Sequence, residues 1–193
     1  MVFAAGNAGP GSQTIGSPAL GKNVIAVGSS QGPRTGFSSF DDGIGTMAIS
    51  SGRGPSDDGR IKPDLVAPGT WIASLLSSVG RVENMWGPIN NEFAYLGGTS
   101  QASPHVAGAA AVFVQYYREH HNGATPSPAL VKAMLINSAE DMATAEIPDN
   151  GGIGGDPGEG DLGGDTIVVG DTGPVPNNDE GWGRIDLENL IDS

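Results

Sequence analysis

The 193-residue sequence contains no cysteine, which excludes disulfide bonds, thiolate catalysis and cysteine-ligated zinc. It has no apolar run of the roughly 18 residues that a membrane-spanning helix requires, so no membrane partner is expected. The first residues, Met1 to Asn7, also lack the basic start and long apolar stretch of a secretory signal. What remains is a chain long enough for one domain with its own apolar core.

Positive charge is scarce as well, with 9 Lys and Arg against 22 Asp and Glu and a net charge of −13. The imbalance is local, because residues 1–139 contain equal numbers of acids and bases. Residues 140–193 hold the whole excess, and Arg184 is their only base. A neutral body with an acidic C-terminal region offers no basic surface to phosphates, which argues against a nucleic-acid partner.

Short apolar runs that end near glycine or proline predict strands buried on both faces of a parallel sheet. They are Val2–Ala5, Val24–Val27, Leu65–Ala67 and Trp71–Ala73. Residues 38–63, which are rich in Ser, Gly, Asp and Arg, are predicted to form a surface loop.

Two helices follow these runs in the sequence. The first is expected from about Ser100 to Tyr117, and Asn122-Gly123 supplies a left-handed end. The second is expected to begin at Pro128, with Ser127 as its N-cap. The alternation of strands and helices favours an α/β fold with a mostly parallel sheet.

The most informative segment is Gly98–Gly108, which places Ser100 on a tight Gly-Thr turn at the start of an apolar helix. A hydroxyl in this position lies where the N–H groups of a helix converge. Pro104 is predicted to fall in the first turn, where its missing N–H has no cost. The pattern is typical of a nucleophilic serine.

This segment resembles the serine motif of the subtilisin-like serine proteases (subtilases, peptidase S8), G-T-S-x-A-x-P-H-V-A-G. Other subtilase motifs are matched in the family's order by Ala4–Asn7, Gly59–Gly69, Val131–Leu135 with Ser138 and Ala139, and Gly181–Arg184. The residues of these motifs are most similar to those of the alkaline, oxidation-tolerant subtilases of bacilli. Gln101 stands where many subtilases have a methionine, which would be open to oxidation beside the nucleophile.

The resemblance implies a secreted, extracellular serine endopeptidase that cleaves polypeptides and needs no cofactor for its chemistry. Ser100 would be the nucleophile, and the side-chain amide of Asn7 would belong to the oxyanion hole. Ala4, Ala5 and Gly6 would form part of the wall of the S1 pocket. The implied fold is the C-terminal portion of a three-layer catalytic domain spanning residues 1–193, in which residues 147–180 form an acidic, flexible insertion.

The family's Asp-Ser/Thr-Gly and His-Gly-Thr-His motifs precede the oxyanion asparagine, and neither occurs ahead of Asn7. The resemblance therefore implies a chain that is inactive alone and needs a missing N-terminal portion as its partner. His105 follows Ser100 by five residues, about 140° around the helix axis, and is expected to be a core or helix-packing residue. His120 and His121 are expected at the surface.

Two features of the acidic region suggest alternatives. Asp171, in a strand-like run before Thr172-Gly173, resembles the missing aspartate motif, but no histidine follows it as circular permutation would require. Residues 151–159 and 160–168 resemble calcium-binding nonapeptides imperfectly, and two units are too few to stack. A solvated turn and loop are favoured in both cases, and structural calcium stays open without assigned ligands.

Three functional hypotheses remain from the sequence. The first is a serine endopeptidase that requires its N-terminal portion. The second is a non-catalytic remnant that acts as a peptide-binding or interaction module, and the third is an independent hydrolase with an unrecognised base. The first is favoured, because an interaction module would not require the serine and oxyanion segments to be intact.

Overall fold

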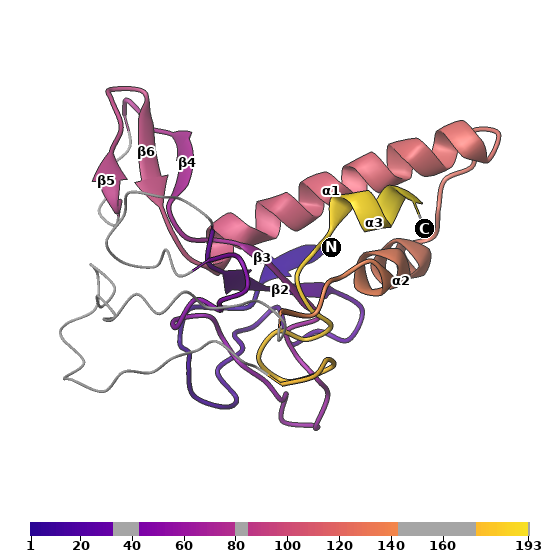
Figure 1. Cartoon of the computed structure of the whole chain (residues 1–193), viewed down its shortest axis with the longest axis horizontal. Helices are drawn as coiled ribbons and strands as arrows, with labels where there is room; N and C mark the ends of the chain where they lie inside the picture. The colour runs from indigo at the N-terminus through magenta and orange to yellow at the C-terminus, as the bar shows by residue number, and fades with distance from the viewer. Residues whose placement is uncertain (33–42, 80–84, 143–172, 193) are drawn as a thin grey trace.

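The computed structural model describes residues 1–32, 43–79, 85–142 and 173–192. A parallel sheet lies at its centre, with the strand order β1-β2-β3 (Figure 1). The strands are β1 (Val2–Ala4), β2 (Ile25–Ser30) and β3 (Leu65–Pro68), and every residue of β2 is buried. The predicted α/β fold with a parallel sheet is confirmed.

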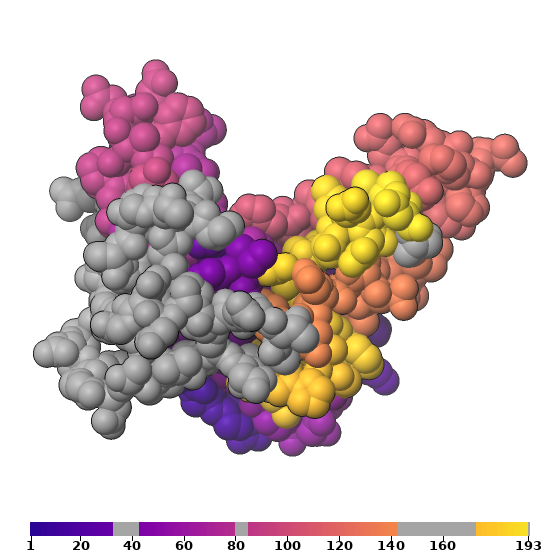
Figure 2. Space-filling view, viewed as in Figure 1, coloured from indigo at the N-terminus to yellow at the C-terminus, as the bar shows by residue number. Residues whose placement is uncertain are grey.

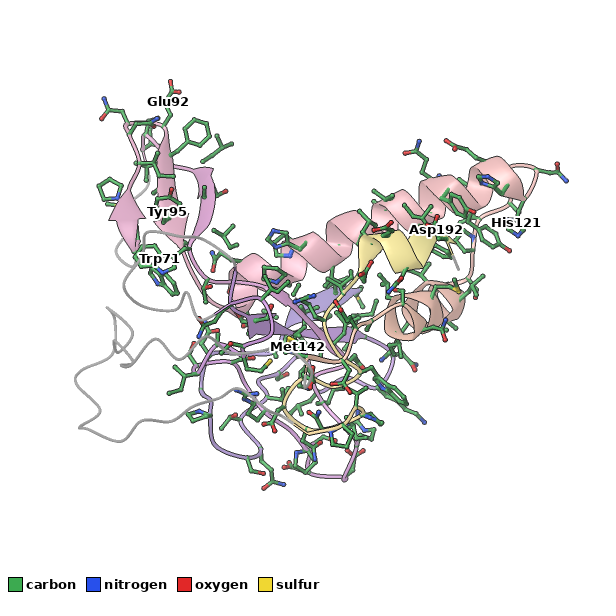
Figure 3. The ribbon with its side chains drawn as sticks, in the orientation of Figure 1. Trp71, Glu92, Tyr95, His121, Met142 and Asp192 are labelled. Atoms are coloured by element: carbon green, nitrogen blue, oxygen red, sulfur yellow. The ribbon has the colours of Figure 1, made fainter. Side chains whose placement is uncertain are left out.

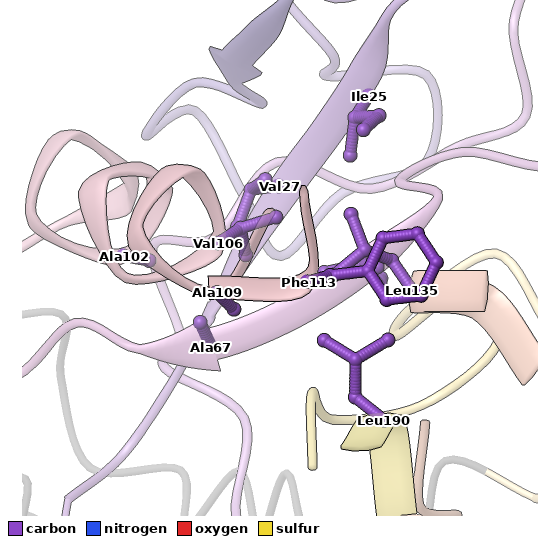
Figure 4. Close-up of a cluster of buried hydrophobic side chains, with 10 residues drawn as sticks. Ile25, Val27, Ala67, Ala102, Val106, Ala109, Phe113, Leu135 and Leu190 are labelled. Carbon is purple, nitrogen blue, oxygen red and sulfur yellow. The ribbon is translucent and has the colours of Figure 1, made fainter. Parts of the chain in front are cut away.

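Three helices accompany this sheet: α1 (Thr99–His120), α2 (Pro128–Asn137) and α3 (Leu187–Asp192). The apolar side of α1 packs on β2 and β3, and α2 and α3 each add a leucine to the same core (Figure 4). The fully packed core cluster consists of Ile25, Val27, Leu65, Ala67, Ala102, Val106, Ala109, Phe113, Leu135 and Leu190. The small residues of α1 allow the helix to approach the sheet closely.

The helix boundaries follow the predicted signals. Ser127 caps α2 by accepting a hydrogen bond of 3.1 Å from the Leu130 N–H, and Pro128 is the first helical residue. After α1, Asn122 and Gly123 have φ angles of 52° and 80°, which give the predicted left-handed turn.

The predicted position of Pro104 in the first turn of the helix is wrong. Because α1 begins at Thr99, Pro104 is its sixth residue and lies inside the helix. Its missing N–H therefore removes the helical donor that the Ser100 carbonyl would otherwise meet. The helix is continuous past this point, because its apolar face remains packed against the sheet.

The segment after β3 forms a separate antiparallel sheet with the order β4-β6-β5, which projects from the body as an arm (Figure 1). Its strands are β4 (Ile72–Leu75), β5 (Gly87–Pro88) and β6 (Phe93–Leu96). We call the described residues 72–79 and 85–96 the arm. The prediction of a buried parallel strand at Trp71–Ala73 is thus wrong, since β4 pairs with β6 instead and is mostly exposed.

The predicted surface loop at residues 38–63 is also corrected for its described part, residues 43–63. Arg53 and Lys62 are among the largest fully buried side chains of the protein. The backbone here bonds to the loops that follow β1, for example from the Gly52 N–H to the Gly6 carbonyl (2.8 Å). Its Ser and Gly residues therefore serve tight internal turns rather than a solvated loop.

The C-terminal segment contributes to the body as well. Glu180 is fully buried and accepts hydrogen bonds from the Met142 N–H (3.2 Å) and the Asn177 side chain (3.1 Å). At the end of the predicted insertion, Glu180 is therefore anchored in the body, while residues 173–179 are half-buried or exposed. Residues 147–172, with Asp171 and both nonapeptides, lie outside the described residues. The short helix α3 has no counterpart among the helices predicted from the sequence.

Candidate active site

Ser100 is exposed at the start of α1, where the chain returns from the arm to the body. The preceding Gly98 has φ 120° and ψ 176°, a conformation that is essentially restricted to glycine. Its N–H donates to the Gly69 carbonyl just after β3 (2.7 Å), which ties the turn to the sheet. A Cβ on Gly98 would lie 2.9 Å from Asn7 Nδ2. The side-chain amide of Asn7 is therefore directly beside the turn that carries Ser100.

The Asn7 amide is held in one orientation by Thr99. Asn7 Oδ1 accepts a hydrogen bond from the Thr99 N–H (2.9 Å) and another from Thr99 Oγ1 (3.0 Å). Since a backbone N–H can only donate, the oxygen of the amide must face Thr99, and Nδ2 must point away from it. The fully buried Thr99 hydroxyl also accepts from the Gly6 N–H (3.1 Å). One hydroxyl therefore links the end of β1 to the amide.

Asn7 also takes the role of a cap for α1. Gly98 has no side chain to cap the helix, and Asn7 Oδ1 accepts the N–H of the first helical residue instead. The N–H of Ser100 has no acceptor within the part of the chain that the structure describes. This N–H and Asn7 Nδ2 are both donors at the positive end of a helix, an arrangement suited to a developing negative charge.

The expected S1 wall lies at the end of β1. Ala5 is buried, and its backbone is fixed by bonds from its N–H to the Val27 carbonyl (2.9 Å) and from the Gly16 N–H to its carbonyl (2.7 Å). Ala4 and Gly6 are half-buried. The hydrogen bond from the Gly6 N–H to Thr99 Oγ1 thus brings the segment next to Thr99. The segment consists of Ala4, Ala5 and Gly6, and the hydrogen bonds of Ala5 hold its backbone in place.

A groove of about 610 Å³ begins at Ser100 and follows α1. Figure 2 shows the molecule hollowed between the arm and α3, with α1 at the bottom. The lining is mostly apolar and includes Ile72, Ser74, Pro104, His105, Ile185 and Leu187. Ser100 is therefore open to a ligand or a further polypeptide segment from this side.

The histidines do not form a pair with Ser100. His105 borders the same groove but is exposed, and its Nδ1 lies 2.9 Å from the Gln101 carbonyl oxygen. Of the two predicted positions, core or helix-packing, the core position is wrong, because His105 is exposed to the open groove. His120 and His121 are surface residues as predicted, about 30 Å along α1 from the serine, and Figure 3 labels His121 there.

A largely buried ion cluster supports the parallel sheet at the start of β3. Asp64 precedes β3, and its carboxylate contacts Lys62 Nζ (2.8 Å), Lys132 Nζ (2.6 Å) and the Ala26 N–H (2.7 Å). Burial of Lys62 lowers the pKa of its ammonium group below the usual 10.5, although the Asp64 carboxylate opposes this shift. The cluster joins β2, β3 and α2.

Among the described residues, no group of three His, Cys, Asp or Glu side chains is arranged to hold a metal ion.

An α/β scaffold that presents a serine at a helix start beside a fixed amide donor has the architecture of a serine hydrolase. Residues 1–183 match the model of the subtilase family, and the chain belongs to that family of serine proteases. No helix in the described ranges is long and apolar enough to cross a bilayer.

Individual relatives agree with this assignment. The chain is 41% identical to the serine protease AprX of Bacillus subtilis over 117 residues, which are 60% of this chain and 26% of AprX. It is 34% identical to pyrolysin of Pyrococcus furiosus over 155 residues, which are 72% of this chain and 10% of pyrolysin. The solved structure of the CspB protease of Clostridium perfringens superposes with a TM-score of 0.59 at 26% identity, covering 95% of this chain and 30% of CspB. The chain thus spans about a quarter of the length of AprX.

Proposed function

We propose that the chain provides the nucleophile and the oxyanion hole of a serine endopeptidase that cleaves polypeptides. Ser100 is the nucleophile, and Asn7 Nδ2 together with the Ser100 N–H forms the oxyanion hole. Ala4, Ala5 and Gly6 form the S1 wall. The main support is the fixed Asn7 amide, because its oxygen caps α1 and this leaves its nitrogen available as a donor beside an exposed serine.

In this proposal the reaction is acyl transfer. A base takes the proton of Ser100 Oγ as this oxygen forms a bond to the carbonyl carbon of the peptide. The two donors stabilise the oxyanion of the tetrahedral intermediate. The C–N bond then breaks, the amine leaves with the proton that the base returns, and water hydrolyses the acyl-enzyme in a second, equivalent addition.

The base and its orienting acid are assigned to a segment outside these 193 residues. No histidine within the described residues makes a hydrogen bond to Ser100, and the open groove gives a neighbouring segment access to the hydroxyl. We therefore expect the isolated chain to be inactive.

In line with the family's chemistry, the reaction is proposed to need no cofactor and to take place outside the cell. A structural calcium without assigned ligands is compatible with the proposal.

A fluorophosphonate probe, which reacts with activated serines, tests this assignment. The isolated chain should not be labelled, whereas the chain mixed with the family's Asp- and His-bearing N-terminal portion should be labelled at Ser100. Ser100→Ala should abolish the signal. Ser103→Ala, which removes another serine of α1, should leave it intact.

The second candidate is a non-catalytic peptide-binding module, which is favoured because none of the described histidines is hydrogen-bonded to Ser100. It predicts no labelling in either sample, together with saturable binding of peptides that Ser100→Ala does not weaken. Strong labelling of the isolated chain would contradict both candidates and support an independent hydrolase whose base has not been recognised.

A further inference from the structure

Trp86, on the arm, covers the turn that precedes Ser100. A Cβ placed on Gly97 would lie 1.9 Å from the Trp86 ring, so the indole occupies the space that a side chain at this position would need. The contact is three residues before Ser100. Only glycine leaves room for a large ring so close to this turn.

Two further aromatic side chains hold Trp86 in place. The Trp71 ring is 5.1 Å from that of Trp86 and 5.9 Å from that of Tyr95, in both cases edge to face. The backbone N–H of Trp86 also donates to the backbone carbonyl of Tyr95 (2.8 Å). All three rings are half-buried, so each retains an exposed surface at the base of the arm, where Figure 3 labels Trp71 and Tyr95.

The backbone at Trp71 is also unusual. Its φ of 50° places a bulky residue in the left-handed region, which costs about 1–3 kcal/mol and is found mainly at functional sites. The bond from the Gly98 N–H to Gly69 ties the chain to the serine turn just before Trp71. The aromatic cluster therefore contacts this turn directly through Trp86 and is linked to it through the backbone at Gly69, two residues before Trp71.

The cluster and the S1 wall reach Ser100 from different directions. The end of β1 contacts the turn at Thr99, whereas Trp86 contacts it at Gly97. Figure 1 shows the arm rising on one side of the start of α1 and the parallel sheet on the other. If the S1 wall receives the side chain before the scissile bond, the chain beyond that bond continues past the arm.

We propose that Trp86, supported by Trp71 and Tyr95, selects polypeptides with an aromatic or branched aliphatic side chain just after the scissile bond. This inference rests on the proposed function and adds a specificity-determining surface to it. The rings offer a rigid apolar face. Binding of a large apolar side chain against this face removes much apolar surface from water and is therefore favourable, whereas alanine buries little surface there.

The test uses the complete protease, which is this chain together with the Asp- and His-bearing portion. Two fluorogenic peptides are compared that differ only by Phe or Ala at the first position after the scissile bond. The unmodified protease should cleave the Phe peptide with a kcat/KM about tenfold higher, the size typical of an apolar pocket. Trp86→Ala should remove this preference, and Trp86→Phe should keep most of it.

Leu75→Ala is the matched control. Leu75 is 78% exposed and pairs with Phe93, about 10 Å further out along the arm than the pair of Ile72 with Leu96. It should leave the preference unchanged.

Fluorophosphonate labelling of Ser100 separates the possible failures. Normal labelling with equal rates for the two peptides in the unmodified protease would overturn the specificity proposal alone, whether or not Trp86→Ala folds. An unchanged preference in a labelled Trp86→Ala variant would also overturn it. Absence of labelling in the unmodified protease would overturn the proposed function.

Discussion

Thr99 Oγ1 donates a hydrogen bond of 3.0 Å to Asn7 Oδ1, although the two residues are 92 positions apart in the sequence. The same hydroxyl accepts from the Gly6 N–H. It therefore sets the orientation of the amide that we assign to the oxyanion hole and the position of the wall that we assign to substrate binding. Substitutions at this contact therefore affect both at once, and all effects on activity refer to the complete protease.

Thr99→Val should lower kcat by about fivefold to tenfold with KM within about twofold, because the loss of one hydrogen bond of about 1 kcal/mol loosens a donor that acts in the transition state. Thr99→Ser should restore kcat. A parallel loss in both variants would show that the methyl group, and not the hydroxyl, is responsible.

Asn7→Leu should lower kcat by a factor of about 10²–10³, a value taken from the corresponding asparagine of subtilisin itself.

Gly98→Ala should destabilise the chain and abolish labelling of Ser100. The added Cβ would lie 2.9 Å from Asn7 Nδ2, and the φ of 120° costs a non-glycine residue about 1–3 kcal/mol. Thermal unfolding measures the first effect. Gly108→Ala is the control, because a Cβ there meets nothing within 4 Å and alanine favours a helix by roughly 0.5–1 kcal/mol. A lower Tm for Gly108→Ala than for Gly98→Ala would contradict this account.

Lys62 should make stability depend on pH in the alkaline range. Burial lowers its pKa in the folded state below 10.5, so between these two pKa values the unfolded chain binds more protons than the folded one. The free energy of unfolding should therefore rise with pH across this window. Below the folded-state pKa, the contribution of Lys62 should be constant.

Urea unfolding from pH 7 to pH 10.5 checks the effect of Lys62. The unmodified chain should gain stability relative to Lys62→Met as the pH rises. Lys22→Met, which alters an exposed lysine, is the control for the loss of one surface charge. A constant difference between the unmodified chain and Lys62→Met would refute the prediction. Asp64 and Lys132 are retained in every variant, so the other members of the cluster are matched.

Gln101→Met should make Ser100 sensitive to peroxide. Gln101 is half-buried, follows the nucleophile directly and borders the groove. A thioether there can become a bulkier, polar sulfoxide beside the hydroxyl. Labelling of the variant should fall after treatment with hydrogen peroxide, and that of the unmodified protease should persist. Met85→Leu tests whether any loss in the unmodified protease comes from the exposed methionine next to Trp86.

Local signals in the sequence were sufficient for the parallel sheet and both long helices. Ser127 with Pro128 marks the start of α2 because a cap and a pre-set φ act within a few residues. The motif around Ser100 likewise combines a glycine that must adopt an unusual φ with small residues that must pack closely. Few other residue types would fit at these positions.

Other features depend on partners distant in the chain. Ile72 looked like a buried strand residue, and its strand became part of the arm only through pairing with residues 93–96. Arg53 looked solvent-exposed because its sequence neighbours are polar, yet distant backbone segments enclose it. The orienting role of Thr99 was missed for the same reason, since the hydroxyl acts on a residue 92 positions away. The motif itself was the only available signal.

The C-terminal residues continue the sheet beyond the point where the family match ends. The Ile185 N–H donates to the Val66 carbonyl (2.9 Å), and Leu190 is completely buried in the core. An expression boundary placed after residue 183 would leave a cavity where Leu190 packs. It would also remove the hydrogen bond from Ile185 to the Val66 carbonyl. A purification tag is therefore better attached after residue 192 through a linker, and a shortened clone would be expected to give misfolded material even with an intact Ser100 motif.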